Sequence, residues 1–183
     1  MDAIRLLDNH TINKIAAGEV VERPASVVKE LVENSIDAKS SAITIEIKDG
    51  GISMIRITDN GVGIPSENVK TAFLRHATSK ITREEDLEKV LSLGFRGEAL
   101  ASIAAVSQLE LITKTSDEIT GKRIELHGGE VMADEEVGCP EGSTIIMRNL
   151  FYNTPPRKKF LQSPASEAAK ISDIVYKLAL GHP

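Results

Sequence analysis

The stretch from Lys29 to Ala38, KELVENSIDA, places acidic and amide side chains at helical spacing. At about 100° per residue, its apolar side chains and the valine before it fall on one helix face: Val28, Leu31, Val32 and Ile36. Its polar side chains fall on the opposite face: Glu30, Glu33, Asn34 and Asp37. Because Glu30 and Asn34 stand four residues apart, we expect their side chains to lie one above the other.

An amide and a carboxylate in this arrangement suit phosphate chemistry. The side-chain oxygen of Asn34 is a good ligand for Mg²⁺, and a magnesium ion held by few protein ligands leaves room for phosphate and water. The carboxylate of Glu30, one turn away, could polarise an attacking water as a general base. A plain solvated helix face is the alternative. The chemical interpretation is favoured because no Lys or Arg stands four residues after Glu30 or Glu33 to pair with it.

A second motif, Asp59-x-Gly61-x-Gly63, lies at the end of a predicted strand. Two glycines in a turn allow the backbone to approach a flat ligand closely. The carboxylate of Asp59 can accept a hydrogen bond from an exocyclic amine such as that of adenine. The alternative is an ordinary turn, for which Asp-Asn-Gly is common.

A third motif, from Gly94 to Leu100, leads a glycine-containing loop into a predicted helix. Free N–H groups at a helix N-terminus, with Arg96 beside them, suit a phosphate chain. The segment from Arg75 to Ile81 has no periodicity, and it could fold over a bound phosphate as a lid. The alternative is a helix start that caps itself.

Neither of the two commonest nucleotide-binding loops occurs in this sequence. The Gly-x-x-x-x-Gly-Lys-Ser/Thr pattern fails at Gly121-Lys122, because Arg123 follows. The Gly-x-Gly-x-x-Gly pattern fails because Ser66 occupies the place of the third glycine.

The elements that must position these residues can be predicted from periodicity and from turn and cap residues. Helices are expected over 11–17, ending at Gly18, from after Arg23-Pro24 to about Ala38 with Ser26 as a cap, after Pro65, over 82–91, over 98–106 and over 166–180, ending at Gly181. Strands are expected over 43–48, 55–59, 109–113, 123–127, 131–134 and 144–148. Helices flanking an antiparallel-looking sheet make the fold α+β.

Composition narrows the class of protein further. The 183 residues suit a single domain, and their formal net charge of −5 gives no electrostatic footprint for nucleic acid. The basic run from Arg157 to Lys159 could touch a phosphate backbone, although the solvated side of a short helix is the plainer interpretation. With one cysteine, Cys139, the chain can form no internal disulfide. No signal peptide or membrane span is evident, so a cytosolic protein is expected.

The order of these motifs resembles that of the GHKL ATPases. That superfamily includes DNA gyrase, the ninety-kilodalton heat-shock chaperones, histidine kinases and MutL. The longer blocks are similar to those of the MutL family of DNA mismatch repair proteins, bacterial members above all. They lie at 15–34, 75–80, 93–100 and 149–155, so that the resemblance extends over nearly the whole chain.

The resemblance implies a GHKL (Bergerat) α/β sandwich, with a mixed, mostly antiparallel sheet and helices on one face. It implies that Glu30 is the general base for ATP hydrolysis, that Asn34 binds magnesium and that Asp59 binds the adenine amine. The adenine pocket would also include Ala38, Gly61, Gly63 and Thr144, with Thr144 near Asp59 under the adenine. The lid and the phosphate cradle would comprise Thr78, Ser79, Lys80, Gly94, Phe95, Arg96, Gly97, Glu98, Ala99 and Leu100.

The resemblance further implies ATP and Mg²⁺ as cofactors and a switch in which ATP orders the lid and favours self-association of two N-terminal regions. The partners would be a MutS-like mismatch sensor and a downstream repair nuclease or helicase, with DNA bound weakly or through the full-length protein, and no membrane. Residues 1–183 are expected to be the ATP-binding domain as a fragment. The second N-terminal domain, which supplies a lysine to the γ-phosphate, and the C-terminal dimerisation domain would be absent.

Two other functions remain open at this stage. One is another enzyme of the same superfamily, such as a histidine kinase catalytic domain or a gyrase-like subunit, although the block at 75–80 argues against it. The other is a nucleotide-gated binding module that does not hydrolyse ATP.

Overall fold

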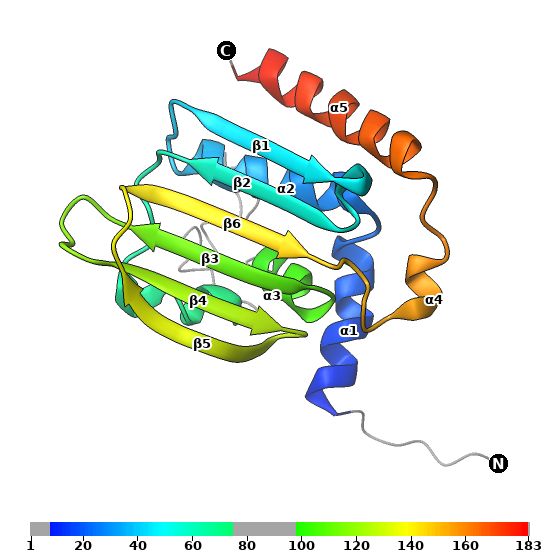
Figure 1. Ribbon diagram of the computed structural model, residues 1–183, viewed down its shortest axis with the longest axis horizontal. Coiled ribbons are helices and arrows are strands. Elements are labelled where there is room, and N and C mark those ends of the chain that lie inside the picture. Colours follow the sequence, from blue (N-terminus) through cyan, green and yellow to red (C-terminus); the bar gives the residue numbers. More distant parts are fainter. Residues whose placement is uncertain (1–7, 75–97, 183) are drawn as a thin grey trace, which may run out of the picture.

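Six strands form one antiparallel sheet in the computed structural model, which describes residues 8–74 and 98–182 (Figure 1). The strands are β1 (Ile43–Lys48), β2 (Met54–Asp59), β3 (Gln108–Lys114), β4 (Gly121–His127), β5 (Glu130–Val137) and β6 (Gly142–Arg148). Their order is β1-β2-β6-β3-β4-β5, and every pairing among them is antiparallel. Because β6 lies between β2 and β3, the end of β2 at Asp59 lies next to the start of β6.

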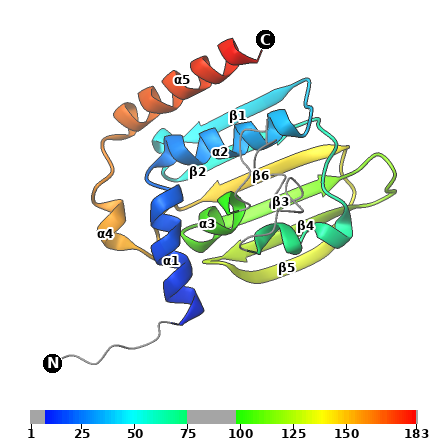
Figure 2. The same cartoon turned by 180° about the vertical axis from the view of Figure 1, so that it is seen from behind.

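Helices cover one face of this sheet. They are α1 (Asn9–Val20), α2 (Pro24–Asp37) and α3 (Ala99–Ala105), and Figure 2 shows them in front of the strands. The alternate strand residues that face them are buried: Ile55, Ile57, Leu109, Leu111, Ile124 and Met147. Burying each such side chain contributes about 1.5–3 kcal/mol, so this layer supplies the main core.

The last two helices lie at the margin of the sheet. After β6 come the short α4 (Pro155–Lys158) and the long α5 (Pro164–Gly181), and α5 packs on α2 and on the turn between β1 and β2. The predicted apolar face of α5 is confirmed, since Ile171 is buried and Ile174, Val175 and Leu178 pack against the core. No helix of the described segments is long and apolar enough to cross a bilayer.

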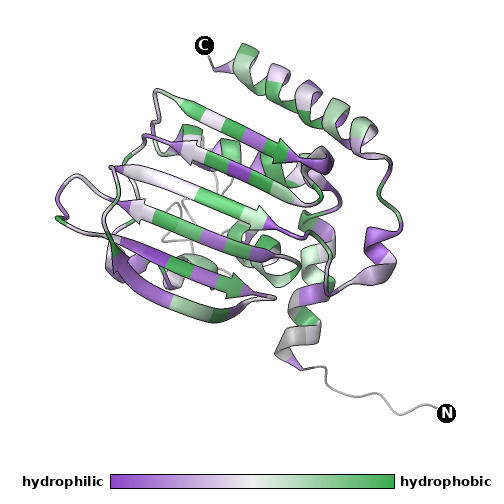
Figure 3. Cartoon of the chain, in the orientation of Figure 1, coloured by the Kyte–Doolittle hydropathy of each residue, from purple (hydrophilic) through white to green (hydrophobic). Residues whose placement is uncertain are grey.

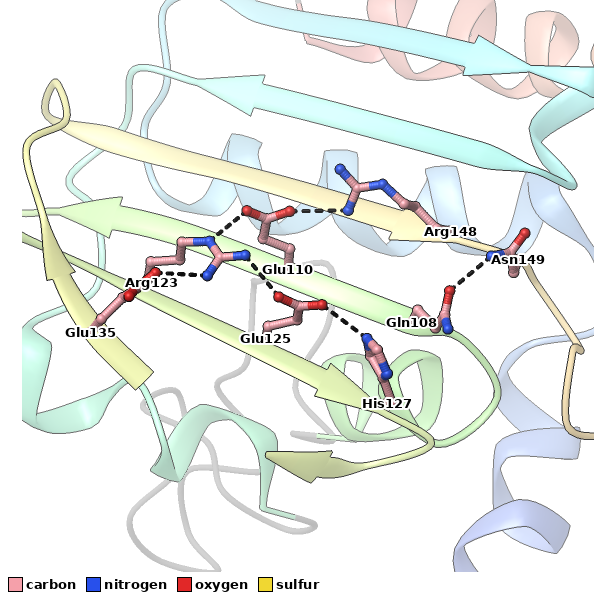
Figure 4. Close-up of polar contacts among 8 residues, drawn as sticks. All are labelled: Gln108, Glu110, Arg123, Glu125, His127, Glu135, Arg148 and Asn149. Carbon is pink, nitrogen blue, oxygen red and sulfur yellow. Dashed lines mark hydrogen bonds and ion pairs between the residues drawn. The ribbon is translucent and has the colours of Figure 1, made fainter. Parts of the chain in front are cut away.

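The other face of the sheet carries charged side chains that pair with one another (Figure 4). The guanidinium of Arg123 reaches the carboxylates of Glu110, Glu125 and Glu135, each at 2.7 Å. Arg148 reaches Glu110 from β6 at 3.0 Å. Burial alone would raise the pKa of Glu110, but the hydrogen bonds from Arg123 and then Arg148 outweigh it and lower that pKa. Figure 3 shows how hydrophilic and hydrophobic residues alternate along the strands.

Three of the predicted helix boundaries are wrong. Gly18 lies inside α1, which continues to Val20, and Gly181 lies inside α5. Ser26 does not cap α2, because Arg23 is the N-cap and Pro24, with its fixed φ, occupies the first helical position. At Gly18 a contact from another element accompanies the continued helix, because the Arg157 guanidinium donates to the Gly18 carbonyl oxygen.

The helix predicted after Pro65 is also wrong. Two short 3₁₀ turns, at Ser66–Asn68 and Thr71–Phe73, take its place. The helix over 98–106 is confirmed as α3. The loop expected over 75–81 and the helix expected over 82–91 lie outside the described residues.

Candidate functional site

One row of side chains runs along α2 at every fourth residue: Glu30, Asn34 and Ala38. The opposite side of the helix is anchored in the core, since Val28 and Leu31 are at most 1% exposed. All three residues of the row are half-buried, and the Glu30 side chain keeps 25% of its surface. The helix therefore carries the two positions on one face, one turn apart, as the spacing predicts.

Glu33 does not belong to this row. Its side chain is 8% exposed and lies 2.9 Å from the ammonium of Lys29, which stands four residues earlier and also lies 3.8 Å from Glu30. Burial would lower the pKa of Lys29, but the hydrogen bond and charge of Glu33 raise it. The expectation that the carboxylates of this helix lack a basic partner is therefore wrong, because Lys29 stands four residues before Glu33.

Asp59 contacts the same helix at Ser35, the residue after Asn34. Its Oδ2 accepts a hydrogen bond of 2.8 Å from the buried hydroxyl of Ser35, and its Oδ1 accepts one of 2.9 Å from the N–H of Gly61. The carboxylate is half-buried and fixed at both oxygens. A carboxylate has about four lone-pair sites, so it can still accept a further hydrogen bond.

The loop after Asp59, residues 60–66, packs directly on the end of the row. A Cβ on Gly61 would lie 2.7 Å from the carbonyl oxygen of Ala38 and 2.8 Å from the Ala38 Cβ, so only glycine allows this approach. Gly63 has a φ of 70°, and a Cβ there would collide with the carbonyl oxygen of Lys114. The sides of both glycines that lack a side chain thus face neighbouring parts of the protein. The sequence had suggested that they would face a ligand.

Thr144 lies elsewhere than predicted. It is paired with Thr58 across β2 and β6, and its hydroxyl donates to the Thr58 hydroxyl at 3.2 Å. Both belong to the outer face of the sheet, with the exposed Arg56. The residue across from Asp59, on the helix-covered face, is Ser143. Sequence reasoning missed it, although the alternation with buried Ile145 could have identified it.

Three of the ten residues expected in the lid and cradle are described. Glu98 is the N-cap of α3 and is half-buried, and the helix continues with Ala99 and Leu100, of which Leu100 packs against the core. The expected helix start is thus present. The other seven lie outside the described residues: Thr78, Ser79, Lys80, Gly94, Phe95, Arg96 and Gly97.

Comparison with known families gives a match over most of the chain, including most of the residues described above. The model of the histidine kinase-, DNA gyrase B- and HSP90-like ATPases matches residues 22–145. That range contains α2, β1, β2 and the loop 60–66, and it ends within β6.

Relatives of known sequence match the chain from end to end. The DNA mismatch repair protein MutL of Agathobacter rectalis is 62% identical over all 183 residues, and that of Symbiobacterium thermophilum is 55% identical. The chain spans 28% and 29% of the length of these two proteins, under a third of each.

Solved structures show the same arrangement of elements. The Aquifex aeolicus MutL ATPase domain complexed with ADP superposes with a TM-score of 0.68 at 37% identity, covering 88% of this chain and 56% of that one. The N-terminal domain of a DNA repair protein superposes with a TM-score of 0.74 at 32% identity, covering 90% of this chain and 47% of that one.

Proposed function

Because the chain belongs to the histidine kinase-, DNA gyrase B- and HSP90-like ATPases and, within them, to the MutL proteins, we propose that it binds Mg-ATP. The proposed site lies between α2 and the loop 60–66. The observation that supports this most is the junction of two motifs far apart in sequence. The row Glu30, Asn34, Ala38 ends where Gly61 meets Ala38, beside Asp59.

We place the adenine at the Asp59 end. Its carboxylate already accepts from Ser35 and Gly61, and it retains acceptor capacity for an exocyclic amine. Ser143, across from Asp59 in the register of β2 and β6, offers a hydroxyl at this end in place of Thr144. The relative from Aquifex aeolicus that was solved with ADP supports an adenine nucleotide as the ligand.

We place the phosphates along the row toward Glu30. The amide oxygen of Asn34 is a hard donor on a half-buried helix face, which fits magnesium held through few protein ligands. Bound magnesium would supply neutralisation of phosphate charge. The carboxylate of Glu30, one helical turn away, would take the proton of the attacking water. Glu98, Ala99 and Leu100, with Thr78 to Lys80 and Gly94 to Gly97, would hold the phosphates.

For the whole protein we propose a role in DNA mismatch repair, as in the MutL relatives. ATP-driven closure of a lid and association of two N-terminal regions would couple a MutS-like mismatch sensor to a downstream nuclease or helicase. The formal charge of −5 favours weak DNA contact by this part of the chain. The site of action would be the cytoplasm.

Replacing Glu30 by Ala in the full-length protein tests the catalytic assignment. Hydrolysis of ATP should fall by about 10²–10⁴-fold, the usual contribution of a general base, because no carboxylate then takes the proton. Binding of ATP should persist, since Asn34 and Asp59 remain. Steady-state phosphate release and equilibrium binding of ATP measure the two effects.

Glu46→Ala is the matched control, because it removes an exposed carboxylate that pairs with Arg56 on a neighbouring part of the sheet. Its hydrolysis rate should equal that of the parent protein. Loss of ATP binding in Glu30→Ala would show that Glu30 is structural. Undiminished hydrolysis would remove it from the mechanism.

A further inference from the structure

The loop 60–66, which forms the proposed adenine end of the site, is held on its first side by the end of α2. The N–H of Val62 donates to the carbonyl oxygen of Ala38 at 3.0 Å. The side-chain oxygen of Asn60 accepts from the N–H groups of Ser41 and Ala42 at 3.0 and 2.9 Å. This side of the loop therefore moves with the helix that carries Glu30 and Asn34.

The second side of the loop is held by β3 and the turn after it, residues 115–120. The N–H of Ile64 donates to the buried hydroxyl of Thr113 at 2.9 Å. That hydroxyl donates to the carbonyl oxygen of Gly142 at 2.9 Å and lies 2.9 Å from the Ser143 hydroxyl. Because a hydroxyl has a single hydrogen, Ser143 is the donor in the latter pair.

Glu118 completes this second side. Its Oε1 accepts from the N–H of Ser66 at 2.8 Å, across 52 residues of sequence. Its Oε2 accepts from the N–H and the hydroxyl of Thr115 at 3.1 and 2.9 Å, inside its own turn. The carboxylate is therefore fixed by its own turn at one oxygen and holds the loop with the other.

The charge of this carboxylate is maintained by the same contacts. Hydrogen bonds from the hydroxyl and N–H of Ser66, followed by those from Thr115, lower the pKa of Glu118 to about 2. Hydrogen bonds to an ionised acceptor are about twice as strong as neutral ones. At neutral pH the contact between Glu118 and Ser66 is thus of the stronger kind.

We propose that Glu118 is a positioning residue for the nucleotide: through Ser66 it sets where the loop 60–66 lies relative to α2, and so fixes the adenine end of the site without touching the ligand. This inference rests on the proposed nucleotide site. The contact of Gly63 with the backbone of Lys114 transmits the position of the turn to the middle of the loop.

Three variants of the 183-residue chain test this proposal. Glu118→Ala removes the anchor, and Glu118→Gln keeps an acceptor oxygen without the charge. Asp117→Ala is the matched control, because it removes the same charge from the same turn at an exposed neighbouring position. For each, we would measure the dissociation constant of ADP by calorimetry, the amide exchange rates of Ile64 and Ser66 without nucleotide, and the midpoint of thermal unfolding.

In Glu118→Ala, ADP should bind about tenfold more weakly, as expected for losing one charge-assisted hydrogen bond that orders the loop. Exchange at Ser66 should accelerate, and the unfolding midpoint should fall by only a few degrees, because solvent screens this contact outside the core. Glu118→Gln should recover part of the affinity. Asp117→Ala should match the parent in all three measurements.

Unchanged ADP affinity in Glu118→Ala, with faster exchange at Ser66, would overturn the proposal. The loop 60–66 would then have lost its anchor without any change in ADP binding. An equal loss in Asp117→Ala would also overturn it and assign the effect to charge alone. If the parent chain binds no ADP while Ser66 exchange still depends on Glu118, the proposed nucleotide site is what fails.

Discussion

Single hydrogen bonds decide which atoms at the site remain for a ligand. Both oxygens of Asp59 are oriented by neighbours, Ser35 from the helix and Gly61 from the loop. An orientation that is set before binding reduces the entropy lost when a ligand is held. Asp59 is thus a pre-oriented hydrogen-bond acceptor. Selective binding of an exocyclic amine would require such an acceptor.

The titration of Glu118 is the prediction that belongs to the residue scale. The pKa of Glu118 is lowered to about 2 from an ordinary value of 4.5. The ionised carboxylate therefore stabilises the folded chain fully above the ordinary pKa, and this stabilisation is lost as the pH falls through about 2. The carboxyl carbon shift of Glu118 should therefore stay constant between about pH 3.5 and 6, where ordinary glutamates titrate. Nuclear magnetic resonance of the labelled chain measures this.

A midpoint for Glu118 near the ordinary value of 4.5 would contradict the contact with Ser66. In the Ser66→Pro variant the N–H donor is absent, so the Glu118 midpoint should rise. The position before it, Pro65, already has an extended backbone compatible with that change.

At the scale of elements, the first helix depends on a residue more than a hundred positions later. The guanidinium of Arg157, in α4, donates to the carbonyl oxygens of Val21 and Gly18 at 2.6 and 3.3 Å, and it lies 4.6 Å from the ring centre of Phe151. It caps the end of α1, whose last carbonyls lack partners within the helix. Burial lowers the pKa of Arg157, and the charge of Glu22 partly offsets this.

Replacing Arg157 by Lys should therefore destabilise the chain although the charge is kept. A lysine ammonium has no planar group to stack on the Phe151 ring, and its side chain is shorter than the one that brings Nη2 of Arg157 to both carbonyl oxygens. The expected loss in the free energy of unfolding is about 1–3 kcal/mol, because buried carbonyl groups lose a charged donor. Urea unfolding measures it, and Lys158→Arg, at an exposed neighbouring position, is the control. An equal stability for Arg157→Lys would show that packing alone holds α1.

At the scale of the whole molecule, the two faces of the sheet have different tasks. The outer face is a network of ion pairs centred on Arg123, and the charges satisfy one another across β3, β4, β5 and β6. The inner face packs α2, and with it Glu30 and Asn34, against β2. The site therefore depends on the core, and binding should be linked to global stability.

ADP should accordingly raise the midpoint of thermal unfolding of the chain. At a free concentration of about 100 times the dissociation constant, binding adds about 2.7 kcal/mol, which corresponds to about 5–10 °C for a domain of this size. Differential scanning calorimetry measures the shift. Asp59→Asn should lose it, because an amide presents a donor where Ser35 and Gly61 already donate. A full shift in Asp59→Asn would place the nucleotide elsewhere.

Much of the element pattern followed from local sequence. Alternation identified β1, and local patterns with turn residues identified the other five strands. Helical periodicity identified α2 and α5, because side-chain direction repeats with the period of the element, and the apolar, Ala-rich composition of 98–106 identified α3. The placement of Glu30 and Asn34 on one helix face follows from spacing alone, since residues four apart on a helix are neighbours. The family resemblance, which matches the chain to MutL proteins, added the roles proposed for these residues.

Other features were decided by tertiary structure. That Lys29 pairs with Glu33, that Ser143 lies across from Asp59 where Thr144 was expected, and that Glu118 holds Ser66 all depend on where side chains from distant segments point. Strand order brings β6 beside β2 over 83 intervening positions between Asp59 and Ser143, and no local pattern encodes that adjacency. Periodicity specifies the direction of a side chain relative to its own element, whereas its partner is set by the packing of elements that bury the common core.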